Sequence, residues 1–330
     1  MVRVSTDHLA GWIVDADAAM TGTGLISPEW LAFCRTHGRM PSFEDTPRPW
    51  MYKGWSLYYV ILLQTCNAPA IPQRWGYLID TLMHGVLPSE GIPWVTFHQP
   101  YQEAAKPAFA QVQRWVSIIE RDGGGWRALV SLLEWLGWSL GVHDSPPELR
   151  ENVCETLYRE VNLRHLLVAA GDYLGTLISQ RFGGGPNAFF PTPQGVCNAK
   201  AEMVFHDARQ AGDTRALRTL DPCCGTGRML LSASNYTMRL TGADIDTTVL
   251  LASRINMALY VPWGLVPIPD DIFDNTRLLT EQVGRFRNLL DTIHRLEPVV
   301  EPSLSQVVIS SREPIPDSRK AQQISLFNLK

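Results

Sequence analysis

The sequence lacks the long apolar run that a membrane-spanning helix needs. Such a helix takes about 18 to 20 apolar residues in a row, and the best candidate, Trp55 to Thr65, is too short. The first residues also lack the basic stretch followed by an apolar run that marks a secretory signal. With 45% hydrophobic and 19% charged residues, we therefore expect a folded protein of the cytoplasm.

Paired cysteines and an excess of basic charge are also missing. The six cysteines show no CxxC spacing of a zinc site, and only Cys223 and Cys224 are adjacent. We expect reduced thiols and no metal. The formal net charge of −4 argues against a protein that coats nucleic acid non-specifically, because phosphate contacts need a positive surface. A local basic face or a basic partner would still allow binding to nucleic acid.

Tryptophan is scarce in the second half of the chain. Ten of the eleven tryptophans precede residue 140, and only Trp263 follows. This shift predicts a boundary near Asp144, with a mainly helical, tryptophan-rich domain at 1–143, a helical connector and glycine-rich linker at 144–187, and an α/β domain at 188–330. The tryptophans could stack on unpaired bases or contact a protein partner, but burial in a core is the commoner use of so large a ring.

Apolar patterning predicts the order of helices and strands. In the first half, helices are expected at 55–65, 75–84 and 126–140. Ser145 is expected to cap a helical stretch reaching about Ser179, with Pro146 and Pro147 in its first turn. After residue 187 short apolar strands alternate with helices down to about His294, which is typical of a parallel α/β sheet.

A strand, a glycine turn and a helix follow one another in the second half. Residues 216–220 are apolar enough for a strand and run through 221–227, Asp-Pro-Cys-Cys-Gly-Thr-Gly, into an apolar helix at 229–234. Glycine at 225 and 227 would let a ligand approach the backbone amides at the helix N-terminus, where a Cβ would collide or forbid the turn. A glycine pair alone is also compatible with a plain tight turn.

An acid after the next expected strand, at 238–242, favours a ribose-containing ligand. Asp244 lies 23 residues beyond Asp221, a spacing at which an acid reaches ribose hydroxyls. Asp246 is expected to cap the helix Thr247–Tyr260, so a second capping acid is the alternative for Asp244. A dinucleotide fingerprint would need a third glycine where the chain has Leu230.

These motifs resemble those of the adenine-N6 DNA methyltransferases, particularly the modification subunits of restriction systems and relatives on mobile elements. The resemblance covers roughly residues 172–273 and includes 188–193, Ala-Phe-Phe-Pro-Thr-Pro, which looks like the aromatic-Thr-Pro motif before the first strand. It implies a Rossmann-like sheet, S-adenosylmethionine (SAM) as cofactor and DNA as partner. It also implies that Thr192 contacts the SAM carboxylate, with Phe190 packed nearby. The residues themselves allow Thr192 as a helix cap and Pro193 as the first helical residue.

The resemblance implies the other cofactor residues as well. In that family the glycine turn surrounds the methionine of SAM, the acid after the second strand binds the ribose, and an acid after the third strand binds the adenine amine. Past a third strand expected at 266–269, we prefer Asp271 to Asp270 for this role, although both could be exposed turn acids. The expected cofactor residues are Phe190, Thr192, Asp221, Pro222, Cys223, Gly225, Gly227, Asp244, Ile245, Asp271 and Ile272.

The catalytic motif of that family is absent. It consists of Asn or Asp, two prolines and an aromatic residue, which accept hydrogen bonds from the amine and stack on the flipped-out base. No Pro-Pro follows Phe273, and the single pair at 146–147 precedes Glu148 instead of an aromatic residue. Only 57 residues follow Phe273, with a helix expected at 277–296 and a strand around 306–310. We therefore expect a sheet that is either truncated or completed by other segments.

The sequence thus supports two main hypotheses. In the first, the chain is a SAM-binding member of this family that methylates an adenine amine in DNA if it is active, with catalytic residues unknown. In the second, it is a catalytically inactive subunit, decoy or regulator in a restriction-modification or anti-restriction system, with a protein partner at the tryptophan-rich half. Methylation of RNA or protein would need a catalytic group that the sequence does not reveal.

Overall fold

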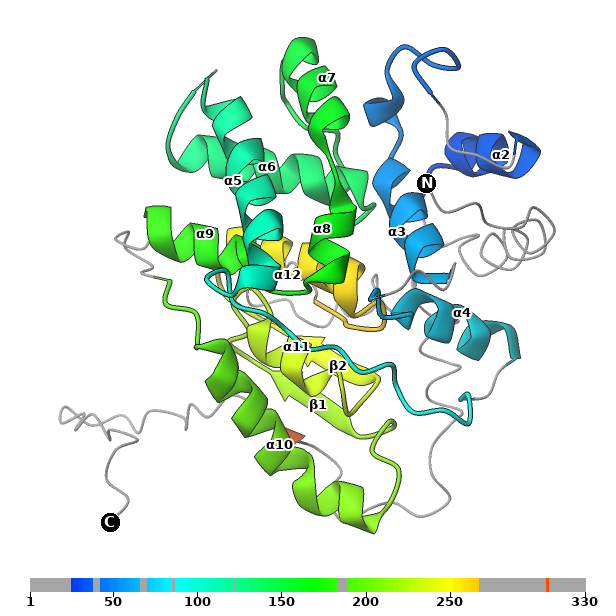
Figure 1. Ribbon diagram of the computed structural model, residues 1–330, viewed down its shortest axis with the longest axis vertical. Coiled ribbons are helices and arrows are strands. Elements are labelled where there is room, and N and C mark those ends of the chain that lie inside the picture. The colour runs from blue at the N-terminus through cyan, green and yellow to red at the C-terminus, as the bar shows by residue number, and fades with distance from the viewer. Residues whose placement is uncertain are drawn as a thin grey trace.

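The computed structural model describes residues 25–37, 42–65, 70–84, 87–121, 123–182, 189–266 and 307–308. Within these ranges the protein is mainly helical, with a small parallel sheet (Figure 1). The helices up to residue 182 are α2 (Pro28–His37), η1 (Pro49–Met51), α3 (Trp55–Thr65), α4 (Arg74–His84), η2 (Glu103–Ala105), α5 (Lys106–Glu120), α6 (Trp126–Ser139), α7 (Glu151–Glu160), α8 (Leu163–Val168) and α9 (Tyr173–Phe182). The later elements are α10 (Gln194–Ala211), β1 (Arg218–Asp221), α11 (Arg228–Ala233), β2 (Arg239–Gly242), α12 (Thr247–Tyr260) and β3 (Val307–Val308).

The sheet has the strand order β2-β1-β3, and both strand pairs are parallel. Asp221 pairs with Gly242 at the carboxyl ends of β1 and β2. Leu265 forms an isolated parallel bridge with Thr241 of β2. The chain therefore runs outward from β1 through β2 to Leu265 and returns to β3 on the other side of β1. Open parallel sheets bind ligands at the carboxyl ends of the strands, beside such a reversal.

The predicted parallel sheet is present in this small form, and a complete Rossmann-like sheet stays a prediction. The observed β3 falls inside the strand expected around 306–310. The helix expected at 277–296, and all but the first residue of the strand expected at 266–269, lie outside the described residues.

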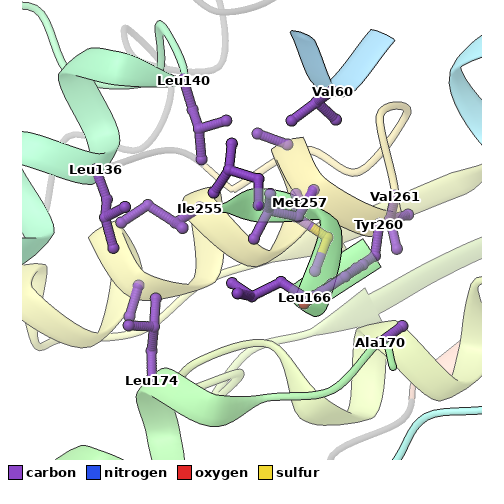
Figure 2. Close-up of a cluster of buried hydrophobic side chains, with 14 of the residues drawn as sticks. Val60, Leu136, Leu140, Leu166, Ala170, Leu174, Ile255, Met257, Tyr260 and Val261 are labelled. Carbon is purple, nitrogen blue, oxygen red and sulfur yellow. The ribbon is translucent and has the colours of Figure 1, made fainter. Parts of the chain in front are cut away.

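Helix α12 lies between the helices of the first half and the sheet (Figure 1). Apart from Arg254, every residue from Val249 to Tyr260 is buried. Figure 2 shows side chains of α3, α6, α8 and α9 gathered around Ile255 and Met257 of α12. A parallel sheet needs helices against its faces. Here helices of the first half cover the side of α12 that faces away from the sheet.

Polar contacts join the two halves at the C-terminal end of α12. Gln64 donates from Nε2 to the carbonyl of Leu259 at 2.7 Å, and Trp75 donates from Nε1 to that of Ala258 at 2.8 Å. The described residues on both sides of Asp144 share one hydrophobic core. This core therefore includes side chains of both halves, and the division of the chain into domains stays a prediction.

Most tryptophans belong to this core, as the commoner use of the ring predicts. The buried ones are Trp30, Trp50, Trp55, Trp75, Trp115, Trp135 and Trp263. Only Trp94 and Trp126 are extensively exposed among the described tryptophans, whereas Trp12 lies outside the described residues. Base stacking or partner contact is therefore open to few of the rings.

The prolines after Ser145 do not open a helix, contrary to the sequence prediction. Helix α7 begins at Glu151, and the residue before it, Arg150, has extended backbone with ψ of 145°. A residue that precedes proline is pushed out of the helical region, and residues 146–150 are not helical. The expected single helical stretch is divided into α7, α8 and α9.

Within the described ranges, no helix combines the length and the apolar character needed to cross a membrane. In the same residues, no three side chains of the kinds that bind metals come together in a cluster.

Candidate functional site

The glycine turn joins the end of β1 to α11 and is tied to the end of β2. Gly225 and Gly227 have φ of +53° and +84°, in the left-handed region that glycine adopts without a steric penalty. Cys224 donates its backbone N–H to the carbonyl of Ala243 at 2.9 Å, and Ala243 donates to the carbonyl of Asp221 at 2.9 Å. The turn therefore lies across the carboxyl ends of both strands.

Asp244 faces this turn and does not cap a helix. Its Oδ2 accepts from the backbone N–H of Gly225 at 2.8 Å, and its Oδ1 accepts from that of Asp246 at 3.2 Å. Asp246 caps α12 as predicted, because its Oδ1 accepts from the N–H groups of Thr248 and Val249. The half-buried carboxylate of Asp244 keeps oxygen lone pairs for a ligand at the mouth of the turn.

Asp221 is the acid of the glycine motif, and only 1% of the residue is exposed. Its Oδ1 accepts a single hydrogen bond of 3.2 Å, from the backbone N–H of Cys223. Burial raises the pKa of Asp221 to about 6, and the charge of Asp244 acts in the same direction, whereas Lys200 lowers the pKa. A positively charged ligand group beside this carboxylate would stabilise its ionised form.

A third acid, Asp172, lies beneath the turn and was not expected from the sequence. Its side chain is fully buried. Oδ1 accepts from the backbone N–H of Gly175 at 2.8 Å and from Nδ2 of Asn256 at 2.9 Å, and Oδ2 accepts from Oγ1 of Thr226 at 2.6 Å and Nε of Arg228 at 3.1 Å. This carboxylate joins the start of α9 to the glycine turn, α11 and α12.

Two sequence signals could have pointed to Asp172. An acid stands alone in the apolar stretch 166–178, and a glycine follows three residues later inside a helical pattern. An aspartate just before a helix commonly bonds the N–H three residues on, which Asp172 does to Gly175. Its long-range partner Asn256 lies 84 residues away, so no local pattern indicates that contact.

Thr192 is exposed and does not cap a helix, so this alternative was wrong. The N-cap of α10 is Pro193, with ψ of 138°, and the helix begins at Gln194. The carbonyl of Thr192 accepts from a terminal guanidinium nitrogen of Arg228 at 3.0 Å. Arg228, the first residue of α11, thereby connects the segment before α10 to the glycine turn.

Phe189 contacts the glycine turn, whereas the role of Phe190 beside the SAM carboxylate stays a prediction. Phe190 is 78% exposed. The ring of Phe189 lies so close to Gly225 that a Cβ at this glycine would be 2.8 Å from Phe189 Cε2. The sequence could not distinguish these adjacent aromatic residues, because only the orientation of the extended backbone decides which of them points inward.

The structure brings together one part of the expected site. Asp221, Gly225, Gly227 and Asp244 meet at the carboxyl ends of β1 and β2, whereas Pro222, Cys223 and Ile245 are present there with exposed side chains. Asp270, Asp271 and Ile272 lie outside the described residues. Because Pro222 and Ile245 are exposed beside the turn, a partly apolar ligand could pack against them.

A cleft of about 420 Å³ opens beside Arg228 and Asp172. One wall is fixed by the backbone N–H of His98, which donates to the carbonyl of Ala170 at 2.7 Å. Other residues along it include Tyr101, Phe109, Ser179, Gln180, Pro193 and Gln194. The site therefore combines an open glycine turn with an adjoining polar and aromatic hollow.

No protein-family model and no curated protein matches the chain. Among solved structures, the chain is similar to the methyltransferase subunit of a type I restriction-modification system from Streptococcus thermophilus, with 14% identity and a TM-score of 0.30. The similarity covers 82% of this chain and 55% of that one. The chain thus spans about half the length of that subunit.

Proposed function

We propose that the chain binds SAM at the glycine turn. The observation that carries the proposal is the placement of Asp244 against Gly225, with a 2.8 Å hydrogen bond, at the carboxyl ends of two parallel strands. Ribose hydroxyls are donors that the remaining lone pairs of Asp244 can accept. The methionine part of SAM then lies toward Asp221 and the segment that contains Thr192.

The charge of the turn favours SAM over a dinucleotide. A dinucleotide places its anionic pyrophosphate on the glycine turn, where the buried carboxylate of Asp221 would repel it. SAM instead carries a sulfonium and an ammonium group, both of which attract that carboxylate. The position of the third dinucleotide glycine is taken by Leu230, whose side chain is completely buried.

Titration calorimetry with SAM tests this proposal and its electrostatic basis together. Below the pKa of about 6, Asp221 is protonated in the ligand-free protein, so binding a cationic group there must first release a proton. We expect one SAM per chain at pH 7.5 and affinity about tenfold weaker at pH 5, one pH unit below that pKa.

Asp221→Asn is the matched control, because it keeps the shape of the side chain and cannot ionise. This variant should bind SAM more weakly at pH 7.5 and lose the pH dependence. If the protein does not bind SAM at pH 7.5, the proposal is wrong. If it binds SAM more tightly at pH 5 than at pH 7.5, Asp221 does not contact a cationic group of SAM.

An adenine amine in DNA is the methyl acceptor that the sequence resemblance implies, but one observation favours binding without transfer. The strand β3 pairs with β1 on the side opposite β2, where the order of the strands in the sheet reverses. The sequence after Val308 reads Ile-Ser-Ser-Arg-Glu-Pro and contains no Asn/Asp-Pro-Pro-aromatic motif. Our second candidate is therefore a SAM-binding subunit, decoy or regulator in a restriction-modification or anti-restriction system.

Transfer of a tritiated methyl group from SAM to unmethylated DNA distinguishes the two candidates. If the second is correct, the purified chain binds SAM and incorporates no label above a heat-denatured control. Steady incorporation by the chain alone would establish the enzyme and reject the second candidate.

A further inference from the structure

The buried carboxylate of Asp172 lies outside the glycine motif and bonds to its centre. Thr226, between the two glycines of positive φ, donates from Oγ1 to Asp172 Oδ2 at 2.6 Å. We propose that Asp172 is a positioning residue for the donor site: it fixes the conformation in which the glycine turn presents its backbone to SAM. This inference rests on the proposed SAM binding.

Thr226 forms hydrogen bonds through its side-chain oxygen and through its main-chain oxygen. Its hydroxyl donates to Asp172, and its carbonyl accepts from Nδ2 of Asn256 at 2.9 Å. The same Nδ2 also donates to Asp172 Oδ1 at 2.9 Å. These three side chains form a closed set of buried hydrogen bonds beneath the turn, and buried networks in which every member is satisfied are rigid.

A glycine inside α9 makes room for this contact. Glycine is a poor helix former, but a Cβ at Gly175 would lie 2.1 Å from Asp172 Oδ2 and 2.4 Å from Thr226 Oγ1. Any side chain at this position would therefore separate the carboxylate from the hydroxyl. The backbone N–H of Gly175 donates to Asp172 Oδ1 at 2.8 Å, which orients the carboxylate toward the turn.

Arg228 balances the charge of Asp172 and connects this acid to the segment that contains Thr192. A terminal nitrogen of the guanidinium lies 3.0 Å from Asp172 Oδ2, and the other terminal nitrogen donates to the carbonyl of Thr192 at 3.0 Å. A carboxylate removed from water needs such a partner. Asp172 is thus connected to the segment that is expected to hold the methionine carboxylate as well as to the glycine turn.

Hydrogen exchange of the backbone amides at 224–228, measured in the full chain without ligand, tests the positioning role. In Asp172→Asn an NH2 group replaces one acceptor and faces donors on either side, and Thr226→Val removes only the hydroxyl donor. We expect both variants to speed exchange in this segment at least tenfold. Thr226→Ser, which restores the hydroxyl, and Asp213→Asn, which breaks the separate ion pair with Arg215, should stay within twofold of the unsubstituted protein.

Calorimetric titration of the same variants with SAM completes the test. We expect the dissociation constant to rise at least tenfold in Asp172→Asn and Thr226→Val, and to be retained in Thr226→Ser and Asp213→Asn. Unchanged exchange in Thr226→Val, or faster exchange with unchanged SAM affinity, would overturn the positioning role. If Asp172→Asn does not fold, the comparison of Thr226→Val with Thr226→Ser tests the positioning role. If the unsubstituted chain binds no SAM, the proposed function fails, while exchange still shows whether Asp172 holds the turn.

Discussion

Replacing Asp244 with alanine is expected to weaken SAM binding by at least about two orders of magnitude. Hydrogen bonds to a charged acceptor contribute about 1.5 to 3 kcal/mol each, and two ribose hydroxyls would lose their acceptor. The variant also loses the 2.8 Å hydrogen bond from the backbone N–H of Gly225, so the turn itself is less well held. About 1.4 kcal/mol corresponds to a tenfold change in affinity, and calorimetric titration with SAM measures it directly.

Asp246→Ala is the matched control, since it removes an acid only two residues away. Asp246 caps α12 through the N–H groups of Thr248 and Val249, and loss of such a cap costs about 1 kcal/mol of folding stability. This variant should therefore unfold at lower urea concentration and bind SAM within about threefold of the unsubstituted protein. Equal losses of affinity in both variants would mean that Asp244 acts through the fold alone.

Replacing Arg74 with methionine is expected to lower the free energy of unfolding by about 3 to 5 kcal/mol, because four acceptors lose a buried donor at about 1 to 3 kcal/mol each and removal of the buried charge offsets part of this loss. The guanidinium is completely buried and donates to the carbonyl of Pro93 at 3.0 Å, Oγ of Ser234 at 2.6 Å, the carbonyl of Tyr260 at 3.1 Å and Oδ1 of Asn235 at 2.5 Å. Methionine fills similar space but offers no donor, so these buried acceptors lose their partner. Urea unfolding followed by fluorescence measures the change.

The contrast with a surface arginine makes this prediction specific. Arg48 forms a bidentate ion pair with Glu151 in which both side chains are more than half exposed, and such pairs contribute at most about 1 kcal/mol. Arg48→Met should therefore be nearly as stable as the unsubstituted protein. If Arg74→Met lowers the free energy of unfolding no more than Arg48→Met does, the buried hydrogen bonds of Arg74 do not stabilise the contact between the two halves.

Features set by adjacent residues could be predicted from the sequence. The bounds of α12, its Asp246 cap and the strand-turn-helix order around Gly225 all follow from apolar runs, capping residues and glycines that act within a few positions. The helix α3 was likewise predicted from Trp55 to Thr65, because its whole apolar run is flanked by breaks.

Features that join distant segments could not be predicted. The bond of Asp172 to Asn256 spans 84 residues, and the bond of Trp75 to Ala258 spans 183. Composition predicts a boundary near Asp144, but it does not indicate that Trp75 of the first half bonds to α12 of the second. At the site, the sequence therefore indicated residues on the loops after β1 and β2, whose role in binding stays a prediction. It missed Asp172, just before α9, and Asn256 of α12, which bond to the glycine turn.

A crystal structure of the chain grown with SAM is the sharpest test of SAM binding at the glycine turn. We expect SAM across the carboxyl ends of β1 and β2, with both ribose hydroxyls bonded to Asp244 and the methionine part beside Asp221 and the glycine turn. SAM bound elsewhere, or a glycine turn that excludes SAM at saturating concentration, would show that this turn is not the binding site.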